Sequence, residues 1–134
     1  KYFYVAEYKK TPVGFLMAYT KEEWLEDNPH WIKDVTWIPR FNIKEVGKFV
    51  LTEKIAVNSN LTGSGIGSII YGRYMKDLRR DDIHNIFSET LISPTPNLAS
   101  LAFRKKQRFT LVGTRFEIHN KKIYTDLVYH KHIK

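Results

Sequence analysis

Apolar residues change their spacing between residues 48 and 80, and the change predicts a strand that leads into a helix. Residues 48–57 are rich in Phe, Val, Leu and Ile, as in a buried strand. From residue 65 to about residue 80, apolar residues recur every three or four positions, which is the spacing of one helix face. Gly63, Gly65 and Gly67 lie between these segments. The sequence therefore predicts a glycine-rich loop between a central strand and an amphipathic helix.

Patterns of the same kind predict the other elements. The segment that follows the helix should be a strand parallel to the central one, because the helix crosses between them. The expected elements are strands over 1–9, 15–19, 83–92, 109–119 and 122–132, turns over 10–14 and 120–121, and a helix over 98–107. This order predicts an α/β fold of the α+β type, with helices packed on the faces of a mixed sheet. At 134 residues, the chain is expected to form a single domain.

The glycine loop has the features of a phosphate-binding site. Glycine lacks a Cβ, so the backbone can adopt positive φ and an anion can approach it closely. The first N–H groups of the following helix have no partner within the helix and lie at its positive end. The G-x-G-x-G spacing fits neither a Walker loop, which needs a Lys after the glycines, nor a dinucleotide fingerprint.

Two motifs instead resemble the GNAT superfamily of N-acetyltransferases. Residues 62–67 fit the family's [RQ]-x-x-G-x-[GA] loop except at Thr62, where the family has Arg or Gln. Residues 97–109 are similar to its later motif, N-x-x-S-x-x-x-Y-x-K-x-G-F. Asn97, Ser100, Lys106 and Phe109 match that motif, whereas Arg104 replaces Tyr and Arg108 replaces Gly. The resemblance covers residues 3–129, and it leads us to expect that a strand and helices preceding residue 1 are absent from this sequence.

The resemblance implies transfer of an acetyl group from acetyl-coenzyme A to an amine acceptor, which the chain does not identify. It also implies a mostly antiparallel sheet whose central strand and parallel neighbour splay apart around the coenzyme. The pantetheine arm would pair with the central strand, and a backbone N–H near its end would polarise the thioester carbonyl. The residues then expected to bind coenzyme are Ile55, Ala56, Val57, Thr62, Gly63, Ser64, Gly65, Ile66, Gly67, Ser68, Asn97, Ser100 and Arg104.

Glu53 and Glu89 are the candidates for a catalytic base, because they lie on the two strands that would border the gap. Each could instead be an exposed carboxylate paired with a Lys. Arg104 stands where the family has its proton-donating Tyr, but a guanidinium does not release a proton at neutral pH. The thiolate would then leave unaided or take its proton from another group, such as Tyr71 or Tyr74.

All three tryptophans lie in residues 21–47, whose pattern predicts least. Residues 21–25 favour a short helical turn, and residues 31–41 favour an irregular strand. Long connections between strands often carry function. Two interpretations remain open: an aromatic lid over the acceptor site, and a cluster packed on the edge of the sheet.

Composition narrows the alternatives. The chain has no Cys, which excludes a cysteine nucleophile, and its five His residues show no metal-binding spacing. The formal charge of +8 fits an anionic partner or a Lys-rich surface, and its even spread does not indicate nucleic-acid binding. No apolar run has the ~18 residues of a membrane helix, so we expect a cytoplasmic protein. A homodimer is compatible with these features. A coenzyme-binding module without catalysis is the alternative to an enzyme.

Overall fold

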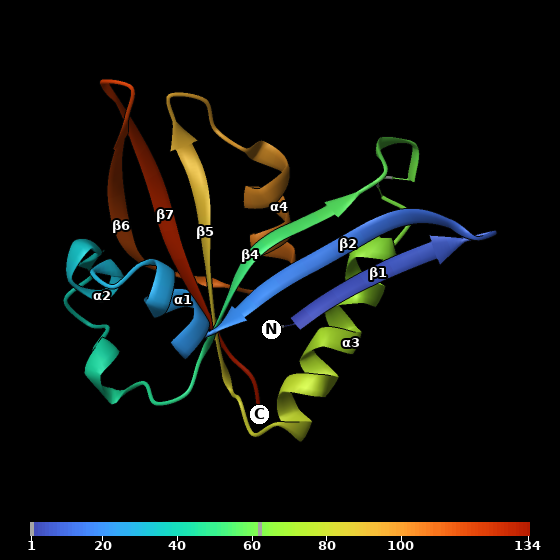
Figure 1. Ribbon diagram of the computed structural model, residues 1–134, viewed down its shortest axis with the longest axis horizontal. Helices are drawn as coiled ribbons and strands as arrows, with labels where there is room; N and C mark the ends of the chain where they lie inside the picture. The colour runs from blue at the N-terminus through green and yellow to red at the C-terminus, as the bar shows by residue number, and fades with distance from the viewer. Residues whose placement is uncertain (1, 62) are drawn as a thin grey trace.

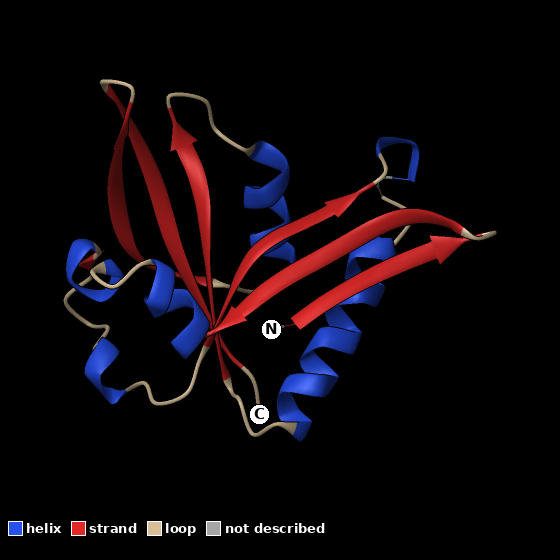
Figure 2. Ribbon diagram, viewed as in Figure 1, coloured by secondary structure: helices blue, strands red, loops and turns tan. Residues whose placement is uncertain are grey.

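A seven-stranded sheet forms the centre of the computed structural model, which describes residues 2–61 and 63–134 (Figures 1 and 2). Its strands lie in the order β1-β2-β4-β5-β7-β6-β3. They are β1 (Tyr2–Tyr8), β2 (Thr11–Thr20), β3 (Thr36–Trp37), β4 (Val50–Val57), β5 (Asn85–Ser93), β6 (Thr110–His119) and β7 (Lys122–His132). β4 and β5 run parallel, and the other described neighbours are antiparallel. The predicted mixed, mostly antiparallel sheet is confirmed.

Helices cover both faces of this sheet. The helical segments are α1 (Lys21–Asp27), α2 (Trp31–Asp34), η1 (Ile43–Glu45), η2 (Ser59–Leu61), α3 (Ile66–Arg80) and α4 (Leu98–Lys106). On one face, Tyr71, Tyr74 and Leu78 of α3 pack against the strands, with Phe103 of α4 beside them. On the other face, α1 and α2 contribute a second core. Each face therefore has its own apolar layer, as the alternation along the strands requires.

The tryptophan-rich segment builds the second core. Trp31 is 1% exposed and contacts Trp24, Trp37, Phe49 and Phe87 through their rings. The packed cluster is thus the correct one of the two interpretations, although it covers a face of the sheet as well as its β3 edge. α1 begins with a capping box, in which Thr20 and Glu23 each accept a hydrogen bond from the other's backbone N–H. That local signal explains why the helical turn was predictable.

Two local predictions were wrong. The first hairpin turns at Lys9 and Lys10, both with positive φ (51° and 64°), and not at residues 10–14. A two-residue turn with both φ positive matches the twist of the flanking strands, while Pro12 is accommodated in β2 opposite Glu7, next to a shift in register. In the second case, residues 31–41 were expected to be a strand. They form α2 and the two-residue β3, because burial of Trp31 outweighs local strand propensity.

β4 and β5 separate soon after they pair. In the described chain their ladder holds three residue pairs, from Val50 with Ile86 to Thr52 with Ser88. Beyond this point β4 stays paired with β2, and β5 stays paired with β7. The sheet therefore divides into two halves that diverge like a fork, with α4 beside the opening (Figure 1). This is the predicted splay, and it leaves one edge of β4 without a strand partner.

Candidate active site

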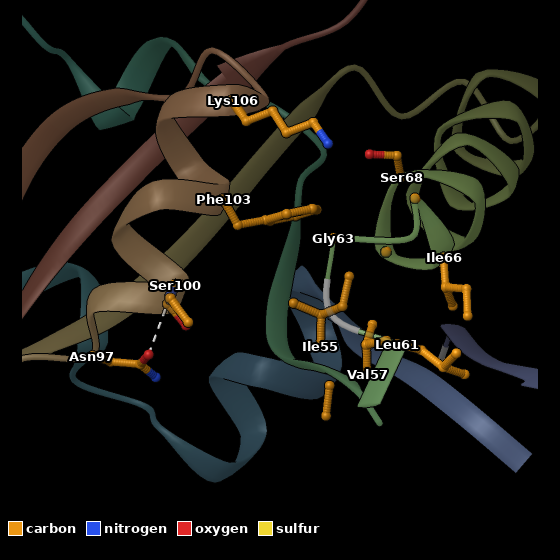
Figure 3. A pocket seen from close by; sticks show the side chains of 14 residues that line it. Ile55, Val57, Leu61, Gly63, Ile66, Ser68, Asn97, Ser100, Phe103 and Lys106 are labelled. Carbon is orange, nitrogen blue, oxygen red and sulfur yellow. Dashed lines mark hydrogen bonds between the residues drawn. The ribbon is translucent and has the colours of Figure 1, made fainter. Parts of the chain in front are cut away.

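A cavity of about 340 Å³ occupies the fork on the α3 and α4 side of the sheet. The end of β4, the glycine loop and α4 each contribute one wall (Figure 3). The lining residues are Ile55, Ala56, Val57, Leu61, Gly63, Gly65, Ile66, Gly67, Ser68, Asn97, Ala99, Ser100, Phe103 and Lys106. Ten of the residues that the sequence assigned to coenzyme binding are among them. The fork thus brings together residues that lie up to 45 positions apart, from Ile55 to Ser100.

The loop wall is shaped by glycine. Gly63 and Gly65 have φ of 85° and 90°, where a side chain would be strained. Gly65 caps α3, and its carbonyl oxygen accepts the N–H of Ile69 at 3.0 Å. The N–H groups before Ile69 at the start of α3 have no acceptor within the helix, so they are available to an anion. Ser64 lies on the loop outside the cavity lining, and Thr62 lies outside the described residues.

The α4 wall adds a cap, a ring and a charge. Asn97 Oδ1 accepts the backbone N–H of Ser100 at 3.1 Å and so starts the helix (Figure 3). Phe103 and Lys106 follow Ser100 at three-residue intervals, which places them on the same face of α4. Lys106 extends into the opening between α4 and α3 (Figure 3). The sequence motif contained Lys106, but only the structure shows that it lines the cavity with Phe103.

Arg104 is not brought together with the other predicted residues. It is 3% exposed and lies beneath α4, with its guanidinium 5.1 Å from the ring centre of Phe109 and 5.8 Å from that of Phe103. Its Nε and Nη1 have no hydrogen-bond partner among the described residues. Burial lowers the pKa of Arg104 from its usual value. One step around the helix from Phe103 turns this residue into the core rather than toward the coenzyme cavity.

Tyr71 and Tyr74 are fully buried beneath the fork. Tyr74 and Thr52 share a hydrogen bond of 3.0 Å between their hydroxyl oxygens. Burial raises the pKa of both Tyr hydroxyls well above the usual range, so both hold their protons at neutral pH. The tyrosines that could replace the family's proton donor therefore lie in the core of the α3 face.

A second cavity, of about 470 Å³, opens on the other face of the sheet. Its walls come from α1, β2, β4, β5, β6 and β7. It is lined by Tyr19, Trp24, Asp27, Asn28, Leu51, Thr52, Glu53, Glu89, Leu91, Arg115, Glu117 and Asp126. Both candidate bases, Glu53 and Glu89, are present. Thr52 contacts both sides of the sheet, because it lines this cavity and bonds to Tyr74 on the opposite face.

A bulge in β4 sets the position of Glu53. Lys54 pairs with Met17 and Thr52 pairs with Ala18, so Glu53 is the extra residue between two register positions. Such a bulge bends a strand and redirects one side chain. Glu53 is exposed and lies beside Tyr19, whose pKa is raised chiefly by a hydrogen bond to this carboxylate. Glu53 therefore reaches the second cavity from the strand that also borders the first.

Glu89 is held in an ion pair. Its two carboxylate oxygens accept hydrogen bonds of 2.6 Å from Nε and Nη2 of Arg115, and Trp31 Nε1 donates a third at 3.2 Å. The side chains of Glu89 and Arg115 are each 12% exposed. These three hydrogen bonds fix the carboxylate of Glu89 in position. The structure therefore distinguishes Glu53 from Glu89, which the sequence alone could not.

The other three acidic residues of the second cavity were not found from the sequence. Asp27, Glu117 and Asp126 come from α1, β6 and β7 and have no shared spacing along the chain. Burial, followed by the neighbouring Glu117, raises the pKa of Asp126 to about 8, and the same contact lowers the pKa of Glu117. Only strand pairing across β6 and β7 brings these carboxyl groups together.

Comparison with known proteins identifies the family. The sequence model of the Acetyltransferase (GNAT) family matches residues 1–109. The chain belongs to this family. It is therefore an acyltransferase. No curated protein gave a significant match.

Solved GNAT structures share the fold. A ribosomal-protein-alanine N-acetyltransferase from Brucella melitensis is 20% identical, with 98% of this chain and 68% of that chain covered and a TM-score of 0.61. An N-acetyltransferase from Staphylococcus aureus Mu50 is 17% identical over 98% and 67% of the two chains, with a TM-score of 0.66. NAA60 from Arabidopsis thaliana, in complex with acetyl-CoA, is 13% identical over 92% and 67%, with a TM-score of 0.63.

Two further structural findings concern the described residues only. Within that part of the chain, no helix combines the length and the apolar character needed to span a bilayer. The same residues include no group of three or more His, Cys, Asp or Glu side chains placed to hold a metal ion.

Proposed function

We propose that this chain transfers the acetyl group of acetyl-coenzyme A to a primary amine by direct attack of the amine on the thioester. The observation that carries the proposal is the fork, where β4 borders a glycine-loop cavity on one face of the sheet and an acidic cavity on the other. An anionic coenzyme fits the first cavity and a cationic amine fits the second. The acetyl-CoA complex of the Arabidopsis protein with the same fold supports the choice of donor.

The pantetheine arm would bind along the unpaired edge of β4. Residues Ile55 to Val57 line the cavity there, and strand addition to an open edge supplies main-chain hydrogen bonds. The pyrophosphate would accept hydrogen bonds from the N–H groups at the start of α3, near Gly67 and Ser68. Lys106 would add a positive charge from α4. These contacts leave the thioester at the point where β4 and β5 part.

The reaction then requires the amine to lose a proton and a C–N bond to replace the C–S bond of the thioester. The neutral amine attacks the thioester carbonyl, a C–N bond forms, and the C–S bond breaks to release coenzyme A as a thiolate. A backbone N–H of β4 near the point where β5 leaves it would stabilise the oxyanion, whereas the N–H of Val57, expected from the sequence, lies five residues, or about 16 Å, further along the strand. Glu53 is the base that we favour, directly or through water, because Glu89 is occupied by Arg115. The thiolate takes a proton from solvent, because Arg104 is not an acid at neutral pH.

Calorimetry with acetyl-coenzyme A tests the binding half of the proposal. Gly67→Asp places a carboxylate in the cavity, and a Cβ at Gly67 meets only ordinary contacts, 3.5 Å from Phe103 and 3.7 Å from Val57. We expect the Kd to rise at least tenfold, or about 1.4 kcal/mol. Gly72→Asp, on the same helix but with open space around its Cβ, is the matched control and should bind normally. Equal affinity of both variants would remove the loop from the site.

Release of coenzyme A in the presence of amines tests the catalytic half. We expect thiol release that depends on both substrates. A chain that binds acetyl-coenzyme A tightly but releases no thiol with any amine would be the non-catalytic binding module instead. A substitution at Gly65 would not test coenzyme binding cleanly, because its φ of 90° means that any side chain there would strain the loop itself.

A further inference from the structure

The second cavity is strongly acidic in a chain whose formal charge is +8. Five carboxyl groups line it against a single guanidinium, that of Arg115. The carboxyl groups belong to Asp27, Glu53, Glu89, Glu117 and Asp126. Arg115 is bound to Glu89 by two hydrogen bonds and lies 3.3 Å from Glu117. One cation cannot offset this many carboxylates, so the cavity holds a local excess of negative charge.

Asp126 is the residue that points to a ligand. It is 7% exposed, and its Oδ2 receives no hydrogen bond from any N–H or O–H group of the described residues. Around it, β5 presents Glu89, and β6 presents Arg115 and Glu117. Its own strand register places it opposite Leu91 on one side and Arg115 on the other. A buried carboxyl group beside a second one needs either a shared proton or a cation to be stable.

The position of Asp126 separates it from the proposed reaction centre. Glu53 is on β4 and Asp126 is on β7, with β5 between them. β4 and β5 no longer pair at these positions, so the two main chains lie farther apart than two strand spacings, which amount to about 10 Å. Both side chains line the same cavity, so a flexible ligand of several methylene groups can reach both. A single ammonium group at Glu53 would leave Asp126 Oδ2 without a partner among the described residues, while Glu117 keeps Arg115 at 3.3 Å.

We propose that the acceptor carries a second cationic group, which binds at Asp126 and Glu117 while the amine to be acetylated lies at Glu53. This inference rests on the proposed function and specifies its substrate class as a primary amine with a second positive charge. Asp27, exposed on α1, adds a further negative charge at the rim.

Calorimetry on the protein saturated with coenzyme A tests the charge requirement without chemistry. The first pair of probes is 1,5-diaminopentane and pentylamine, which differ by one ammonium group. The second pair is alanyl-lysine amide and alanyl-norleucine amide. We expect the dication of at least one pair to bind tenfold or more tightly than its monocation. Preference in the first pair identifies a small diamine, and preference in the second identifies a peptide side chain. Equal affinities in both pairs, or no binding, overturn the inference.

Two substitutions locate the second charge. Asp126→Asn should abolish the preference for the dication, and Asp27→Asn should reduce it. Glu26→Gln is the matched control, since Glu26 is exposed beside Asp27 on α1 but does not line the cavity. Asp27 is at the surface, so its variant remains informative if Asp126→Asn fails to fold. An undiminished preference in both Asp variants contradicts the assignment.

The pH dependence of the Kd for the dication distinguishes a binding role of Asp126 from a purely structural one. Below a pKa of about 8, Asp126 is protonated in the free protein and must lose its proton to bind a cation. The Kd for the dication should therefore fall as pH rises from 7 to 9, whereas Asp126→Asn should show no such change. If in both pairs the dication and the monocation are acetylated equally well, the inference fails and the acetyltransferase proposal stands. If acetyl-coenzyme A does not bind, the acetyltransferase proposal fails, whatever the amines do.

Discussion

Glu53 and Glu89 differ in their partners, although they lie on the two strands that border the fork. Glu89 is fixed by Arg115 and Trp31, and Glu53 is exposed at a bulge beside Tyr19. A base must exchange protons with its substrate, which favours the accessible carboxylate. A carboxylate in a largely buried ion pair contributes instead to stability, because removing it takes from Arg115 the acceptor of its two shortest hydrogen bonds and leaves it with Glu117.

Substitution with Gln separates these two roles. Glu53→Gln should lower kcat at neutral pH and flatten the acidic limb of the pH–rate profile, with little change in melting temperature. Glu89→Gln should cost about 3 kcal/mol of unfolding free energy, because Arg115 loses the carboxylate that accepts two of its hydrogen bonds at 2.6 Å. Steady-state kinetics and thermal unfolding of both variants provide the check. The opposite assignment follows if Glu89→Gln melts normally and loses its turnover.

Arg104 and Lys106 are both basic residues on α4, but they have different surroundings. Lys106→Met should raise the Kd for acetyl-coenzyme A about tenfold at low salt and less at high salt, because exposed charges are screened. Arg104→Met should leave this Kd unchanged and unfold with at least the wild-type free energy. Its buried guanidinium has two unpaired nitrogens, and an apolar chain of similar length avoids that desolvation cost. A salt-sensitive rise in Kd for Arg104→Met would place its guanidinium at a phosphate.

At the scale of elements, the fork converts an ordinary strand into a binding surface. β4 keeps β2 on one side along its whole length, but it loses β5 after Thr52. Alternate N–H and C=O groups of residues Ile55 to Val57 therefore face the cavity and not a neighbouring strand. The element is stable because β2 and the α3 core hold it, so its open edge is available for a ligand.

Hydrogen exchange measures whether the coenzyme uses this edge. We expect peptides covering residues 53–58 to gain protection when acetyl-coenzyme A binds, because the pantetheine arm adds hydrogen bonds to β4. Peptides from the β6–β7 hairpin should not change, since its two strands pair with each other and neither lines the coenzyme cavity. Saturating coenzyme with no change in residues 53–58 would show that it binds elsewhere.

The elements also show how far local patterns can be trusted. The glycine loop, α3, α4 and the β6–β7 hairpin carry their signals in adjacent residues, and the sequence predicted each of them. The fork and most of the coenzyme cavity follow from those elements together with the family resemblance. The Trp31 helix was missed because long-range packing decides it. Asp126 and Arg115 were missed because their roles depend on partners that only strand pairing brings near.

At the scale of the whole molecule, the two cavities beside the fork differ in charge. The formal charge is +8, yet the cavity on the α1 and α2 side is lined by five carboxyl groups, while Lys106 lines the cavity on the other side. An anionic coenzyme and a cationic acceptor would thus enter from opposite faces and meet at the fork. Each face attracts one substrate and repels the other, so neither substrate needs to leave before the other binds.

This arrangement predicts a sequential mechanism with a ternary complex. A ping-pong reaction would need a nucleophile to hold the acetyl group between the two substrates, and the chain contains no Cys to serve as one. Initial rates measured at several fixed amine concentrations should give intersecting lines in double-reciprocal plots. After incubation with acetyl-coenzyme A alone, intact mass spectrometry should show no addition of about 42 Da, the mass that a covalently bound acetyl group adds. Direct attack would be refuted by parallel lines together with an acetylated protein that passes its acetyl group to an amine. Such a result would require a side chain at the fork to act as the nucleophile, a role that the proposed mechanism gives to neither Glu53 nor Thr52.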